Sequence, residues 1–334
     1  FSAHSFLNHG LYQTTMSLPD TPTPPRHLLI DRDYVVLIDT EGGVCRLHPE
    51  RFNAIDPIRH PFPGSITNSA IVGEHFLVAT WVERDLSLAR LAMLDLREPI
   101  ESGIEMSDLR VAVDAGKSNH HHVAGAVWSH ILDAEPLAIC EHDGDIVFCT
   151  HHRGLYRIGI NSHEVWRRKP LGWDWLADLP DGDVLVKLIS VGDSIWAFSL
   201  GGGWAELEGS TGQVTRKGIH QFKSSTHDVW YGGDGNWLFS LSENRMAWWN
   251  SEAESISMVN ISGPIQDAYM VEETWFITGW RQDLKWPASQ FHSEPDVGVR
   301  AEIGNKIVNR NEDGFWVLDN RGQWSDFVIR GNSS

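Results

Sequence analysis

Four tryptophans recur at nearly equal intervals in the second half of the chain. Trp196, Trp237, Trp275 and Trp316 are separated by 41, 38 and 41 residues. Each lies in a short apolar run that follows an acidic or glycine-containing turn, as in residues 193–200 (DSIWAFSL). A period near forty residues indicates a repeat architecture in which similar units pack against one another.

Three earlier segments carry an aliphatic residue at the equivalent position. Val36, Leu77 and Val147 extend the series, and the steps from Val36 to Trp196 are 41, 70 and 49 residues. The runs are short, rich in Val, Ile, Phe and Trp, and separated by turns that contain Gly, Asn or Asp, which is typical of β-hairpins. Seven such units predict an all-β chain folded as a seven-bladed β-propeller of four-stranded antiparallel blades.

Seven modules of about forty residues nearly use up the 334 residues, so we expect a single domain. The last module offers three strands, and we expect its fourth strand to come from the N-terminus, within residues 10–18. Residues 1–25 would then be a closing strand and a Pro-rich linker. Because closure of the ring removes free sheet edges, deletion of residues 1–18 is expected to lower the melting temperature.

The long step of 70 residues predicts an insertion between blades two and three, residues 99–133, which contains His120, His121 and His122. We expect this insertion to overhang the third blade, where a turn carries His151 and His152. Imidazoles from both clusters would suit a transition metal. Against a metal, consecutive histidines are expected to point in different directions, and no Glu or Cys completes a known motif. The alternative is a His-rich surface loop without any cofactor.

Other aromatic and basic residues are expected on the same face, because links between blades and the turns between second and third strands share one end of a propeller. Loops of this kind carry most binding sites, and Trp and Arg dominate binding hot spots. The candidate binding residues are Trp173, Trp175, Trp280, Arg281, His151, His152, Arg153, His220 and His227. For Trp173 and Trp175 the alternative is a purely structural role, in which both pack on blade four or plug the channel.

The charge balance limits the classes of partner. The chain has 27 Lys and Arg against 45 Asp and Glu, a net charge of −18, and no extended basic run. Binding to a phosphate backbone requires clustered cations, so nucleic acid is not an expected partner. No apolar run is long enough to cross a membrane, so no membrane insertion is expected.

The cysteines favour a reducing compartment. Cys45, Cys140 and Cys149 are odd in number, lack metal-ligand spacing and lie in or beside apolar strands, where buried free thiols are common. We therefore expect a cytoplasmic protein. Because the sequence begins with Phe1, a processed N-terminus and a periplasmic or secreted location are the alternative.

Two blades resemble the PQQ-like repeat. In residues 154–168 (GLYRIGINSHEVWRR) a strand ends in a Gly-containing turn and a final strand ends in Trp166, and residues 204–214 keep the Thr211-Gly212 turn without the closing Trp. The likeness covers about a fifth of the chain. Quinoprotein dehydrogenases with this repeat have eight blades and a calcium-quinone site, neither of which is visible here. The resemblance to this and to WD-like repeats implies a scaffold.

Blade five is similar to the repeat of the streptogramin B lyase group of seven-bladed propellers, over residues 227–245 (HDVWYGGDGNWLFSLSENR). Members of that family use a metal with His and Glu for ring-opening elimination. Their catalytic His and Glu have no matching positions in this blade, so no residue role is transferred.

Catalytic motifs are scarce, since the sequence has no G-x-S-x-G, H-E-x-x-H or Walker pattern. We therefore expect a non-catalytic scaffold or interaction module, a subunit of a larger complex that binds a protein partner or a small-molecule ligand through its loops. One alternative is a propeller enzyme, a lyase or hydrolase with or without a metal, whose histidines surround the channel mouth. Another is a lectin that stacks sugars on Trp173, Trp175 and Trp280.

Overall fold

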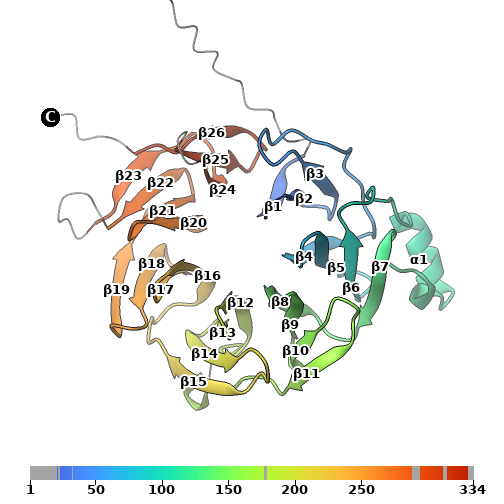
Figure 1. Ribbon diagram of the computed structural model, residues 1–334, viewed down its shortest axis with the longest axis horizontal. Coiled ribbons are helices and arrows are strands. Elements are labelled where there is room, and N and C mark those ends of the chain that lie inside the picture. The colour runs from blue at the N-terminus through green and yellow to red at the C-terminus, as the bar shows by residue number, and fades with distance from the viewer. Residues whose placement is uncertain are drawn as a thin grey trace, which may run out of the picture.

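The computed structural model describes residues 21, 23–31, 33–176, 179–287, 294–310 and 314–329. They form seven antiparallel sheets arranged around a central axis (Figure 1). The predicted all-β, seven-bladed propeller is therefore confirmed.

The strands follow the chain from the axis outward in each blade. Blade one holds β1 (Pro25–Ile30), β2 (Val35–Asp39) and β3 (Val44–Leu47), and blade two holds β4 (Ser65–Val72), β5 (Phe76–Glu83), β6 (Leu88–Asp95) and β7 (Ala126–Leu132). Blade three holds β8 (Pro136–His142), β9 (Asp145–Thr150), β10 (Gly154–Ile158) and β11 (Glu164–Arg168), and blade four holds β12 (Leu185–Val191), β13 (Ser194–Ser199), β14 (Gly203–Glu208) and β15 (Val214–Ile219).

The last three blades follow the same order. Blade five holds β16 (Thr226–Gly233), β17 (Asn236–Leu241), β18 (Arg245–Asn250) and β19 (Ser255–Asn260). Blade six holds β20 (Ile265–Val271), β21 (Thr274–Gly279), β22 (Gln282–Trp286) and β23 (Asp296–Val299), and blade seven holds β24 (Gly304–Asn309), β25 (Phe315–Asp319) and β26 (Trp324–Asp326).

The periodic tryptophans lie in second strands and pack between blades. Trp196 of β13 and Trp237 of β17 come from neighbouring blades, and their ring centroids are 4.8 Å apart in one buried cluster. Trp275 of β21 joins the next cluster, which includes Leu238 of blade five. Large aromatic rings bury much apolar area at such wedge-shaped contacts, which explains why the period is marked by Trp.

The inserted segment lies inside blade two, which corrects its expected place between blades two and three. Residues 126–132, part of the expected insertion, form β7, the fourth strand of blade two. The segment before it carries α1 (Met106–Asp114) and η1 (Ser118–His120), and α1 lies on the outer rim of the ring beside β7 (Figure 1). Leu109 of α1 is buried in a cluster with Phe62 and Trp81, so the insertion is part of the core.

Blades one and seven each show three strands among the described residues. In blade one, isolated bridges from Val44 to Arg59 and from Leu47 to Ala54 run along the outer edge of β3. For blade seven, the predicted closing segment, residues 10–18, lies outside the described residues. The chain just before β1 does reach blade seven, since the Thr21 amide donates a hydrogen bond to the Gly322 carbonyl at 2.8 Å. Ring closure by the N-terminus stays a prediction.

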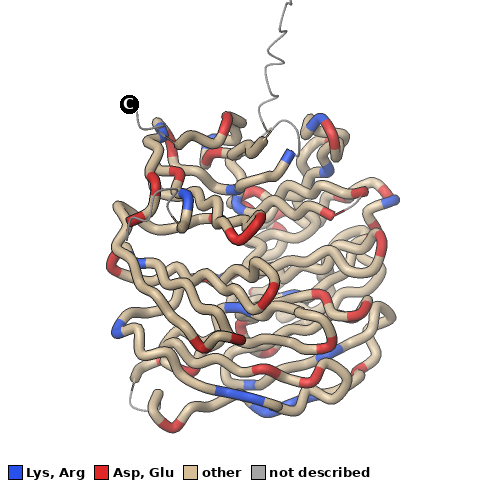
Figure 2. The backbone as a smooth tube through the Cα atoms, turned by 60° about the vertical axis from the view of Figure 1, so that its left-hand side comes forward, with Lys and Arg blue, Asp and Glu red and all other residues tan. Residues whose placement is uncertain are grey.

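Charged residues are spread over the whole ring, and Asp and Glu outnumber Lys and Arg (Figure 2). None of the helices in the described part of the chain has the length and apolar character needed to span a membrane.

Candidate functional site

A groove of about 1000 Å³ opens on the face of the ring that holds the links between blades and the turns between second and third strands, here called the loop face. Four loops form its walls: the links β11–β12 and β15–β16 and the turns β13–β14 and β17–β18. It therefore sits over the junction of blades four and five. The groove unites three of the residues predicted as binding residues, which are Trp173, Trp175 and His220.

Trp173 and Trp175 have opposite roles although they are two residues apart. Trp173 is 5% exposed, and its indole nitrogen donates a hydrogen bond to the Trp204 carbonyl at 3.3 Å. A Cβ on Gly203 would lie 2.7 Å from the Trp173 ring, so the glycine makes room for it. Trp175, in the single turn η2 (Asp174–Leu176), is 82% exposed at the groove. Trp173 thus holds the loop, and Trp175 is presented to solvent.

His220 lies in an aromatic cluster beside the groove. Its ring centroid is 4.5 Å from Trp249, 5.1 Å from Phe222 and 5.5 Å from Phe239. Burial penalises the charged imidazole and lowers the pKa of His220 to about 4. Its buried Nε2 has no hydrogen-bond partner among the described residues. At neutral pH the groove therefore borders a neutral imidazole.

The charges around the groove are mixed. Lys217 and Lys223 come from β15 and the following link, and Asp174 and Glu243 come from the other loops. The Lys217 amine donates a hydrogen bond to the Gly172 carbonyl at 3.2 Å, which joins two walls of the groove. The groove therefore combines apolar side chains with charged groups of both signs at its rim.

The other predicted binding residues lie outside this groove. Trp280 and Arg281 form the β21–β22 turn of blade six, and Trp280 is 50% exposed. His227 is an exposed residue of β16. His151, His152 and Arg153 form the β9–β10 turn of blade three, where Arg153 pairs with Asp133 at 3.5 Å.

The two histidine clusters that were expected to meet are held by different parts of the fold. Ligand atoms of His151, His152 and Asp181 lie within 4.8 Å of one another. No such group of three or more among the described residues includes His120, His121 or His122, which belong to the insertion of blade two. The side chain next to the blade-three histidines is thus Asp181, which the sequence analysis did not single out, and not the second histidine cluster. Nothing in the sequence around a single loop Asp indicates that it lies close to histidines of another blade.

The central channel contains a smaller cavity of about 260 Å³ that is lined by inner strands. Lys187 pairs with Asp228 at 2.7 Å and Lys306 pairs with Asp267 at 3.1 Å across neighbouring blades. Burial, reinforced by Arg26, Lys187 and Lys306, lowers the pKa of His27 to about 4. The channel is thus lined by ion pairs and a neutral histidine.

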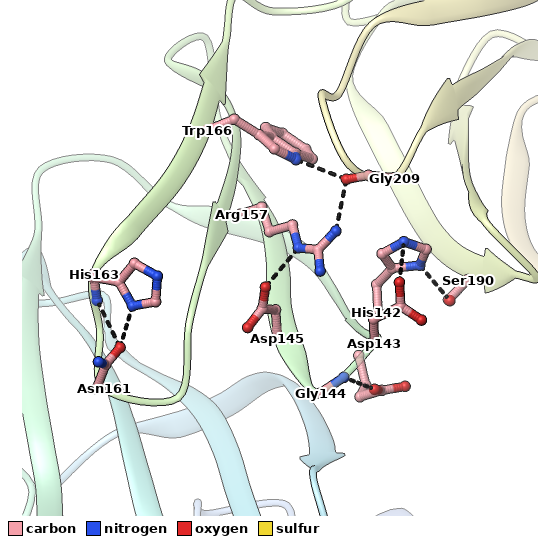
Figure 3. A network of polar contacts seen from close by, with 11 residues as sticks. His142, Asp143, Gly144, Asp145, Arg157, Asn161, His163, Trp166, Ser190 and Gly209 are labelled. Atoms are coloured by element: carbon pink, nitrogen blue, oxygen red, sulfur yellow. Dashed lines mark hydrogen bonds and ion pairs between the residues drawn. The ribbon is translucent and has the colours of Figure 1, made fainter.

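A contact between blades three and four has the residue types of a hydrolase triad. Nδ1 of His142 lies 2.8 Å from Ser190 Oγ, and Nε2 lies 3.5 Å from a carboxylate oxygen of Asp143 (Figure 3). However, His142 is 1% exposed, and a Cβ on Gly209 would lie 1.8 Å from Nε2. The imidazole is closed to a substrate, so we assign it to the interface between blades.

Comparison with known proteins yields no matching family model and no matching curated protein. The chain is similar in structure to the WD40 β-propeller domain of Doa1, with a TM-score of 0.61, 9% identity and coverage of 92% of this chain and 94% of that one. It is also similar to the computationally designed protein Ika8, with a TM-score of 0.60, 10% identity and coverage of 94% and 98%.

BamB from Moraxella catarrhalis is a further similar structure, with a TM-score of 0.56, 10% identity and coverage of 90% of this chain and 96% of that one. At such identities the likeness concerns the fold alone. Together with the seven sheets of the ring, it supports the seven-bladed propeller fold that WD-like and PQQ-like repeats also form. The chain is a seven-bladed β-propeller.

Proposed function

We propose that the protein is a non-catalytic interaction module that binds a protein partner through its loop face, as a subunit of a larger assembly. The docking site is the groove at blades four and five. The observation that carries this proposal is the exposure of Trp175, which is 82% accessible at the edge of a groove of about 1000 Å³. Trp is the residue type most enriched at binding hot spots.

The surroundings of Trp175 support a protein segment as the ligand. The exposed Leu179 and the neutral His220 provide apolar surface, while charged groups at the edges come from Lys217, Lys223 and Glu243. An apolar anchor side chain of the partner would fill the groove, and its flanking polar groups would meet the charged rim. The structural similarity to a WD40 domain is compatible with this role at the level of the fold.

The alternatives have less support. A lectin would need Trp173, Trp175 and Trp280 as a joint platform, but Trp173 is buried and Trp280 lies on another blade. A propeller enzyme would need the loop histidines around one channel mouth. The described histidines are spread over separate loops, and the triad-like contact of His142 is closed.

The test compares two exposed tryptophans of the loop face. Full-length protein and the variants W175A and W280A would be used to capture partners from native extract, with retained proteins quantified by mass spectrometry. We expect W175A to lose a defined partner at least tenfold while W280A keeps it. Retention of the same partners by W175A would contradict the proposal.

A further inference from the structure

We propose that His151, His152 and Asp181 form a binding site for a divalent transition metal, with Zn²⁺ as the best match to two imidazoles and one carboxylate. The ligand atoms of the three side chains lie within 4.8 Å of one another. Ligands bound to one zinc ion at about 2.0–2.2 Å are typically about 3–4 Å apart, so small side-chain rotations complete the site.

The geometry of a turn brings the two histidines to the same side. In a strand, His151 and His152 would point to opposite faces. Here the backbone of His152 is left-handed, with φ 57°, in the β9–β10 turn. As a result the two imidazole centroids are 3.8 Å apart. The argument against a metal that consecutive histidines point in different directions therefore does not apply to this turn.

Both supporting loops are anchored by backbone hydrogen bonds. The His151 amide donates to the Glu135 carbonyl at 2.8 Å, which ties the first loop to the start of blade three. The Val184 amide donates to the Asp181 carbonyl at 3.0 Å, and the Gly201 amide donates to the Gly182 carbonyl at 2.8 Å. Asp181 is therefore held against blade four. Ligands on anchored loops lose little entropy when they bind an ion.

The three side chains have no competing partners in the described part of the chain. Neither imidazole and no oxygen of the Asp181 carboxylate makes a hydrogen bond or an ion pair there, and the nearby Arg153 pairs with Asp133 instead. His151 is half-buried, and the His152 and Asp181 side chains are exposed, so an ion can reach all three. Neutral imidazole and ionised carboxylate are the forms that bind metal at neutral pH.

Three protein ligands leave room for a fourth. A cavity of about 30 Å³ lies beside His151 and His152, and Asp183 also lines it. This volume admits a water molecule, which would complete a tetrahedral zinc site. A bound ion would also join the blade-three turn to the loop that holds Leu179, Pro180 and Gly182, which form a wall of the groove. The metal would thereby order the proposed docking site.

The experiment titrates chelator-treated, untagged full-length protein with ZnCl₂ by isothermal titration calorimetry. We expect one equivalent to bind. D181N and H152N should each weaken binding at least tenfold, and both substitutions suit the left-handed backbone at these positions, φ 58° and 57°. The matched control is H120Q in the other histidine cluster, which should leave the affinity unchanged.

Thermal melting of each variant without metal separates loss of a ligand from loss of the fold. All three changed side chains are exposed, so the melting temperature should stay within about 2 °C of the wild-type value. Absorption of the Co²⁺-substituted protein supplies a second readout, because tetrahedral coordination gives an intense visible band that D181N should abolish. Absence of stoichiometric binding, equal affinity of D181N, or loss of affinity in H120Q would each overturn the site.

Discussion

The indole nitrogen of Trp166 in blade three donates a 2.8 Å hydrogen bond to the carbonyl of Gly209 in blade four. Arg157 donates to the same carbonyl at 2.8 Å and pairs with Asp145, so two side chains of one blade hold a turn of the next (Figure 3). Gly212 of that turn lies against the Trp166 ring. The closing Trp and the Thr-Gly turn of the PQQ-like resemblance are thus partners across a blade junction.

Replacement of Trp166 by Phe removes this hydrogen bond and leaves a void beside Gly212. We expect W166F to lower the free energy of unfolding by about 2 kcal/mol, measured by urea denaturation. W175F is the matched control, because Trp175 is exposed and makes no comparable contact. If the urea midpoint of W166F equalled that of the wild type, the contact of Trp166 with the blade-four turn would not stabilise the junction.

Gly209 has no space for a side chain. A Cβ there would lie 1.8 Å from Nε2 of the buried His142, so G209A is expected to destabilise the protein by more than about 2 kcal/mol. A Cβ on Gly172 would meet no atom within 4 Å, and G172A should therefore be neutral. The double variant G209A/H142A should regain part of the loss in the same urea titration. If the double variant were no more stable than G209A alone, the steric explanation would be contradicted.

Stability should fall in mild acid. The pKa values of His27 and His220 are lowered to about 4 in the folded protein, from 6.5. The unfolded chain therefore binds more protons between pH 6.5 and 4, and the free energy of unfolding decreases as pH falls through this range. Each histidine should contribute about 1 to 2 kcal/mol of this loss at about pH 5.

Denaturation at several pH values tests the contribution of the two histidines. H220Q removes one titrating group, so its stability should depend less on pH between 6.5 and 4 than that of the wild type. H120Q, which changes an exposed histidine, serves as the control and should follow the wild-type curve. If the free energy of unfolding of H220Q depended on pH as steeply as that of the wild type, His220 would be protonated equally in the folded and unfolded states, and the prediction would be wrong.

Deletion of residues 1–18 tests the closure of the ring. The described chain reaches blade seven through the Thr21 to Gly322 hydrogen bond, just before blade one begins. If the preceding residues supply the fourth strand of blade seven, the deletion should lower the melting temperature by several degrees or more. A melting temperature equal to that of the full chain would refute closure by this segment.

The inner parts of the blades could be predicted from the sequence, and the outer parts could not. Second strands such as β13 and β17 are buried and apolar, so their period was visible. Outer strands such as β7 have no fully buried residue and carry a weak pattern, so the boundary of the insertion was misplaced. The helix α1 has nine residues, of which Leu109 and Ala112 are buried, too few for a clear helical period.

The candidate site was predictable only as a set of loops. Trp173 and Trp175 share the same local sequence, and which of them is exposed depends on the space provided by Gly203, a tertiary contact. The approach of Asp181 to His151 likewise depends on how neighbouring blades pack. Such contacts join residues far apart in the chain, and a single sequence carries little information about them.

The central claim, that the groove at Trp175 docks a protein partner, is tested most directly by site-specific photo-crosslinking in cells. A photoreactive amino acid would replace Gln221, an exposed residue that lines the groove, in one variant that keeps Trp175. In another variant it would replace Trp280, which lies on the same face but outside the groove. We predict that a defined protein crosslinks from position 221 and not from position 280. No adduct at 221, or the same adduct with equal yield at both positions, would contradict docking at the groove.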